Sequence, residues 1–150
     1  MDLHFFKWMP RANAAQTKKD ITLLVFLHGM GGTGQIWRPI AAVLEEEFLC
    51  IAPDQRGHGQ SRPVPTDSAN QFHASDYASD IAPLIQKLVD EHAPSSFYII
   101  GHSMGVRSGL ATASSILNAR KDSTSGIRSE LRKIFKGFIS VDIGLQSKWG

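Results

Sequence analysis

Residues 101–105 read GHSMG, and they follow directly on the apolar run SFYII (96–100). A Gly-x-Ser-x-Gly pattern between a strand and a helix has a steric reason, because the serine stands on a turn so sharp that side chains two residues away on either side would collide. Gly101 and Gly105 remove those side chains. The pattern predicts a turn that lifts the Ser103 hydroxyl above the carboxyl end of a sheet, although the pentapeptide alone also suits a plain strand-to-helix connection.

Around this turn, apolar runs of strand length alternate with segments whose apolar residues repeat at helical spacing. The expected strands are residues 3–8, 21–28, 48–53, 96–100 and 136–144. The expected helices are residues 36–44, 74–93 (with Ser75 or Asp76 as N-cap), 103–119 and 130–135. Strands that alternate with helices imply right-handed crossovers. The sequence therefore predicts the α/β class, with a mostly parallel sheet, helices on both faces and a single domain over residues 1–150.

The composition argues against several classes of protein. The 16 basic and 14 acidic residues are scattered along the chain, so there is no concentrated basic face for nucleic acid. The one cysteine, Cys50, lies in the apolar run FLCIAP, which predicts a packed thiol and excludes an internal disulfide. No apolar stretch is long enough for a membrane span and the first residues do not resemble a signal peptide, so we expect a cytoplasmic protein. The oligomeric state stays open.

A second glycine loop, HGMGG (28–32), follows the buried strand ITLLVFL. It can present the backbone N–H of Met30 to the same point as the N–H of Met104, which begins the helix after Ser103. Two such donors suit an oxyanion hole. The rival reading is a phosphate loop, but GMGGTG has neither the spacing of dinucleotide sites nor the Lys-Ser/Thr of a P-loop. We expect neither a metal nor an organic cofactor.

Four motifs occur in one order: HGMGG, DQRGHGQS (54–61), GHSMG and SVDIG (140–144). Together they resemble the α/β-hydrolase fold superfamily, and most closely its esterase and lipase-like branch. The resemblance implies that Ser103 is the nucleophile and that Met30 and Met104 supply the oxyanion-hole N–H groups. It also implies that residues 54–61 form a structural loop.

Other positions carry weaker implications. The resemblance implies that His28 and His102 are architectural supports for the two glycine loops. One departure is Val106, followed by Arg107, where relatives commonly have a second glycine or alanine. We expect this departure to hold the helix slightly further from the neighbouring strand.

A nucleophilic serine needs a base, normally a histidine oriented by a carboxylate. In this fold the chain order is Ser, then Asp or Glu, then His. No histidine follows Ser103, because all six precede it. Asp142 has the position from which a minority of the superfamily supplies the acid, but a strand-end aspartate also commonly caps a turn.

These observations predict an α/β-hydrolase fold that lacks its C-terminal strands, with the base beyond residue 150. The expected function is hydrolysis of ester, thioester or related acyl bonds of a small molecule, with this chain alone inactive. A serine at the turn argues against epoxide hydrolase and dehalogenase chemistry, but not against C–C bond hydrolases, perhydrolases or acyltransferases. The alternatives are a non-catalytic, truncated or decayed binding protein and a half-domain completed by another chain. The acyl substrate and any lid stay open.

Overall fold

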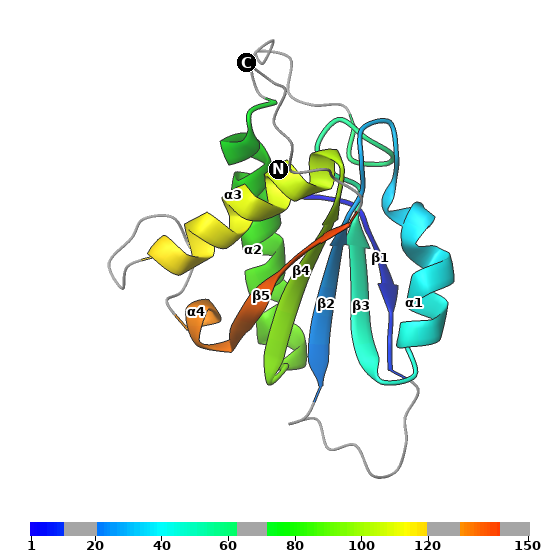
Figure 1. Cartoon of the computed structure of the whole chain (residues 1–150), viewed down its shortest axis with the longest axis vertical. Coiled ribbons are helices and arrows are strands. Elements are labelled where there is room, and N and C mark those ends of the chain that lie inside the picture. The colour runs from blue at the N-terminus through cyan, green and yellow to red at the C-terminus, as the bar shows by residue number, and fades with distance from the viewer. Residues whose placement is uncertain (11–20, 63–71, 120–129, 142–150) are drawn as a thin grey trace.

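The computed structural model describes residues 1–10, 21–62, 72–119 and 130–141 (Figure 1). Within them, five strands form one sheet in the order β1-β3-β2-β4-β5. The strands are β1 Phe5–Trp8, β2 Thr22–Leu27, β3 Phe48–Pro53, β4 Ser96–His102 and β5 Phe135–Val141. Strand β1 pairs antiparallel with β3, and the other three pairs are parallel. The predicted mostly parallel α/β sheet is therefore confirmed.

Helices cover both faces of this sheet, as predicted (Figure 1). They are the 3-10 turn η2 Gly34–Trp37 and the α-helices α1 Arg38–Leu44, α2 Ala74–His92, α3 Met104–Asn118 and α4 Leu131–Ile134. On one face α1 and η2 pack on the sheet, and on the other face α2 and α3 do so. Both faces are buried, which is typical of parallel sheets.

Strand β2 contributes side chains to the hydrophobic cores on both faces of the sheet. Leu23, Val25 and Leu27 pack in the cluster that contains α2 and α3, whereas Leu24 and Phe26 pack with Trp37 and α1. Successive side chains of a strand point to opposite faces, so a strand with helices on both sides must be apolar throughout.

Cys50 lies in β3 on the α1 side of the sheet and is 0% exposed. The prediction of a packed thiol is therefore confirmed.

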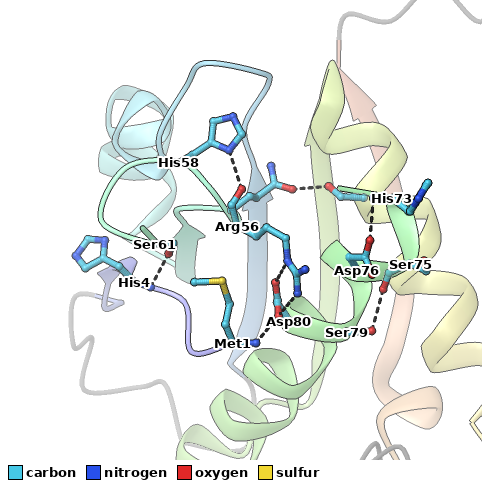
Figure 2. A network of polar contacts seen from close by, with 12 residues as sticks. Met1, His4, Arg56, His58, Ser61, His73, Ser75, Asp76, Ser79 and Asp80 are labelled. Carbon is cyan, nitrogen blue, oxygen red and sulfur yellow. Dashed lines mark hydrogen bonds and ion pairs between the residues drawn. The ribbon is translucent and has the colours of Figure 1, made fainter. Parts of the chain in front are cut away.

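The start of α2 corrects one expectation. Neither Ser75 nor Asp76 is the N-cap, because the helix begins at Ala74 and is capped by His73. Asp76 instead lies in the first turn, where its carboxylate accepts a 2.9 Å hydrogen bond from the His73 N–H (Figure 2). An acidic residue three positions after the cap satisfies an orphan donor and also favours the positive end of the helix dipole.

Several other elements differ in their bounds from the expected ones, among them β5, which begins at Phe135, a residue that was expected in the helix of residues 130–135. Strand β1 begins at Phe5, since pairing with β3 begins opposite Pro53. Strand β4 continues to His102, because Gly101 pairs with Leu27 and His102 pairs with Val141. Lastly, the expected helix of residues 36–44 is divided between the 3-10 turn η2, which comes first, and the α-helix α1. No helix in the described part of the chain has both the length and the apolar character to cross a membrane.

Candidate active site

Ser103 occupies the sharp turn between β4 and α3. Its backbone has φ 51° and ψ −116°, a conformation that non-glycine residues rarely adopt. The two flanking glycines make the turn sterically feasible. A Cβ on Gly101 would lie 2.4 Å from the carbonyl oxygen of Gly105, and a Cβ on Gly105 would lie 2.2 Å from that of Leu27. Helix α3 thus approaches the backbone of β2 directly below Ser103, through a contact that only glycine permits.

The loop that follows β2 touches this turn. A Cβ on Gly29 would lie 3.1 Å from the Cβ of Ser103 and 3.0 Å from Nδ1 of His102. Met30, the next residue, is 81% exposed. Met104 is the first residue of α3, so its N–H has no intrahelical acceptor. The structure thus brings the loop that contains Met30 close to Ser103, next to the helix start at Met104.

His28 holds the base of that loop. Its Nε2 accepts a 3.0 Å hydrogen bond from the N–H of Gln55, so Nδ1 carries the proton and donates to the carbonyl oxygen of Gly29 at 2.7 Å. The ring is fully buried. Burial lowers the pKa of His28 and outweighs the opposing effect of the Gly29 carbonyl. With both nitrogens engaged, a neutral His28 is a structural support and is not placed to act as a base.

Gln55 connects three elements below the turn. Its side-chain nitrogen donates to the carbonyl oxygen of His28 at 2.7 Å, and its side-chain oxygen accepts from the hydroxyl of Ser108 at 2.5 Å. Gln55 follows β3, His28 follows β2 and Ser108 lies in α3. Sequence reasoning missed this bridge, and the only available signal was a polar residue at the end of a buried strand.

Asp54 organises the loop of residues 54–61. Its carboxylate accepts hydrogen bonds from the N–H groups of Gly34 and Gln60, at 2.8 and 2.9 Å, and lies 2.9 Å from Nδ1 of His4. Burial raises the pKa of Asp54, but these hydrogen bonds lower it more, so the pKa lies below its ordinary range. Gly59 has φ 49° and leaves no room for a Cβ against the same carboxylate. The loop is therefore built around a buried, ionised aspartate.

Arg56 ties this loop to α2 (Figure 2). Its guanidinium donates from Nε and Nη2 to both carboxylate oxygens of Asp80, at 2.7 and 2.9 Å, and both side chains are nearly buried. The hydrogen bond to Asp80 raises the pKa of Arg56. The amine of Met1 also lies 2.5 Å from Asp80. Arg56 is thus committed to structure, which agrees with the role that the resemblance implied.

A pocket of about 400 Å³ opens beside Met30 and Met104. Its other walls come from the loop of residues 54–61, the start of α2 and the first turns of α3. The lining residues are Met30, His58, Phe72, His73, Ala74, Tyr77, Met104, Arg107 and Ser108. Ser103 borders the pocket through its neighbour Met104 and is not itself part of the lining.

The base and acid of a triad are not seen among the described residues. No histidine there hydrogen-bonds the Ser103 hydroxyl. His58, on the pocket wall, has its Nδ1 3.0 Å from the carbonyl oxygen of Arg56. Asp142, the expected acid, lies outside the described residues. Among the described residues, no three or more His, Cys, Asp or Glu side chains are grouped so that they could hold a metal ion.

Comparison with known proteins agrees with this geometry. Residues 22–116 match the α/β-hydrolase fold. A curated relative, the 2-(acetamidomethylene)succinate hydrolase of Mesorhizobium japonicum, is 38% identical over 91 residues, which are 61% of this chain and 30% of that protein.

Solved structures show the same likeness. An esterase from a marine microorganism aligns with a TM-score of 0.61 and 26% identity, over 95% of this chain and 42% of the esterase. A crystal structure of E-2-(acetamidomethylene)succinate hydrolase aligns with a TM-score of 0.60 and 28% identity, over 84% of this chain and 38% of the hydrolase. The chain thus spans less than half the length of each of these relatives.

Proposed function

The chain belongs to the α/β-hydrolase fold family, and from that premise we propose that it carries the nucleophile of a serine hydrolase acting on ester, thioester or related acyl bonds of small molecules. The observation that carries the proposal is the backbone of Ser103, which is held at φ 51° between two glycine contacts and against the loop of Gly29. A strained serine at such a turn is the arrangement of a nucleophile elbow.

In the proposed reaction, the Oγ of Ser103 attacks the acyl carbon and forms a bond to it, while the carbonyl oxygen becomes an oxyanion. The backbone N–H groups of Met30 and Met104 hold that oxyanion. A base takes the Ser103 proton, and as the oxyanion collapses the bond from the acyl carbon to the leaving alcohol, thiol or amine breaks and the base gives that group the proton. Water then attacks the acyl carbon, the bond to Oγ breaks, and the acid is released while Oγ regains a proton. This role for the two N–H groups is supported by the contact of the Gly29 loop with Ser103 and by the place of Met104 as the first residue of α3.

The base is proposed to be a histidine from a segment outside these 150 residues, and Asp142 is the proposed acid. Two observations support this assignment for the base. His28 uses both ring nitrogens in structural hydrogen bonds, and the chain spans only 30% of the curated relative. The relatives described above, an esterase and a hydrolase, support hydrolysis as the reaction.

The alternative is a binding protein that uses the pocket without catalysis. The observation that favours it is the absence of a histidine bonded to Ser103 among the residues that the structure describes. The two functions differ in one measurable property, the reactivity of the Ser103 hydroxyl.

A fluorophosphonate probe tests that property in the chain itself. We expect the probe to label Ser103 only slowly in the chain alone, and we expect added imidazole to accelerate labelling because it supplies a base. Ser103→Ala should abolish labelling. Ser79→Ala, which removes an exposed hydroxyl of α2, is the matched control and should label like the unmodified chain. If Ser103 reacts no faster than other serines, with or without imidazole, the binding function is favoured instead.

A further inference from the structure

Arg107 is a cation on the wall of the pocket beside Ser103. Among the residues that the structure describes it forms no ion pair and no hydrogen bond through its guanidinium, and no carboxylate lines the pocket. Arg56, at the nearby loop, is by contrast bound to both oxygens of Asp80. The pocket therefore contains a guanidinium group that no described residue neutralises.

The position of Arg107 in α3 places this charge close to the proposed chemistry. Arg107 is the fourth residue of α3 and Ser103 is the N-cap of that helix, so their backbones lie about 6 Å apart along the helix axis. Side chains of a helix also lean toward its N-terminus, which for α3 is the end at Ser103. A group bound by the guanidinium would be held within a small molecule's length of the Ser103 hydroxyl.

The rest of the lining includes both polar and apolar side chains. The polar ones include His58 and His73, and the apolar ones include Met30, Phe72 and Met104. The hydroxyl of Ser108 is already donated to Gln55. A pocket of about 400 Å³ with apolar walls and a few convergent polar groups suits a small organic ligand.

We propose that this pocket selects acyl substrates that carry a carboxylate, with Arg107 binding that carboxylate while Ser103 reacts at the acyl carbon. The substrate class is the half-ester, half-thioester or half-amide of a small dicarboxylic acid, which deepens the proposed function and rests on it. A planar guanidinium matches the two oxygens of one carboxylate, and such paired, charge-assisted hydrogen bonds are among the stronger ones in proteins. Arg107 is therefore the proposed specificity-determining residue.

Equilibrium binding of a product-like diacid tests this inference without any need for reactivity at Ser103. Glutarate, its uncharged analogue glutaramide and inorganic phosphate are titrated by calorimetry into the chain with Ser103→Ala. We expect glutarate to bind at least about tenfold more tightly than glutaramide and than phosphate, the size of effect expected for one charged hydrogen-bonding pair.

Three variants assign the effect to one side chain. Arg107→Gln should weaken glutarate binding by about tenfold or more, and Arg107→Lys should weaken it less, because the charge remains while the planar fork is lost. Arg38→Gln, at the exposed start of α1 on the opposite face of the sheet, should leave binding unchanged. A thermal unfolding curve of each variant verifies that it is folded.

Equal binding of glutarate and glutaramide, or an unchanged affinity in Arg107→Gln, would overturn the inference. Phosphate binding as tight as that of glutarate would overturn the carboxylate class. The two proposals fail separately. Labelled Ser103 with no preference for glutarate removes only this inference, whereas glutarate binding through Arg107 with unreactive Ser103 removes the hydrolase function and leaves a carboxylate-binding pocket.

Discussion

The hydroxyl of Ser108 donates a 2.5 Å hydrogen bond to the side-chain oxygen of Gln55, 53 residues earlier in the chain. The amide nitrogen of the same Gln55 donates to the carbonyl oxygen of His28. One buried side chain therefore connects α3, which begins at Met104, to the loop that contains Met30. In the proposed hydrolase, these two elements carry the two oxyanion donors.

Replacement of Gln55 by leucine should destabilise the chain more than its size suggests. The substitution leaves the buried carbonyl of His28 without the amide donor of Gln55, at about 1–3 kcal/mol. It also removes the 2.5 Å acceptor of the Ser108 hydroxyl, which keeps only longer contacts of 3.3 and 3.5 Å to the carbonyl oxygens of Gly105 and Met104. Urea unfolding measures the loss. Ser108→Ala in the same background should cost less than it does alone, with a coupling of about 0.5–3 kcal/mol. Gln35→Leu, at an exposed glutamine, should have little effect, and strictly additive losses would contradict the bridge.

Replacement of Gly105 by alanine should push α3 away from the sheet. The added Cβ would meet the carbonyl of Leu27 at 2.2 Å, and neither backbone can yield cheaply. Overpacking of this kind costs about 1–3 kcal/mol and occasionally more, and we expect the upper end of that range. Gly31→Ala is the contrast, since Gly31 has φ +74° but open space around it. It should cost about 1–2 kcal/mol, from backbone strain alone. Equal losses in urea unfolding would contradict the close approach.

Stability should fall below about pH 6.5, in part because of His28. Its pKa is lowered in the folded state, chiefly by burial, so the unfolded chain binds a proton that the folded chain does not. Stability is therefore fully present above the unfolded pKa and falls as the pH drops toward the folded one, by up to about 1.4 kcal/mol per pH unit. Urea unfolding from pH 5 to 8 should show a shallower slope for His28→Gln. The same slope in both chains would contradict a neutral, buried His28.

The thiol of Cys50 should be inert in the folded chain. Burial, and secondarily the nearby Glu45, raise its pKa to about 12, and only the thiolate is nucleophilic. A thiol reagent such as dithionitrobenzoate at pH 8 should react at once with the urea-unfolded chain and only slowly with the folded one. Similar rates in both states would show that β3 is not packed as described.

Much of the fold could be predicted from the sequence because each buried strand needs an apolar run whatever its neighbours are. The run FLCIAP corresponds residue for residue to β3, Phe48–Pro53. The cap of α2 was misplaced, because Asp76 has the residue type of a cap and acts three positions later, as the partner of His73. Residue type alone does not distinguish these two uses of an acidic side chain.

Less of the site could be predicted, because its other contacts join residues that are far apart in the sequence. The Gly-x-Ser-x-Gly turn is a local steric arrangement, so five residues suffice to indicate it. The proposed role of Arg107 depends instead on the absence of a carboxylate from the described lining of the pocket. The sequence shows a charged residue in a helix, whereas only the packed pocket shows that no described carboxylate lines it.

By itself, the sequence determined the α/β class, the turn at Ser103 and the two glycine loops, because these depend on local sterics and on runs of apolar residues.

The tertiary structure alone decided that Gln55 bridges His28 and Ser108, that Arg56 is bound to Asp80, and that Arg107 faces a pocket without a described counter-charge. Parallel strands bring their carboxyl ends to one edge of the sheet whatever their separation in the chain. Contacts at that edge are therefore fixed by strand order and register, which no short stretch of sequence contains.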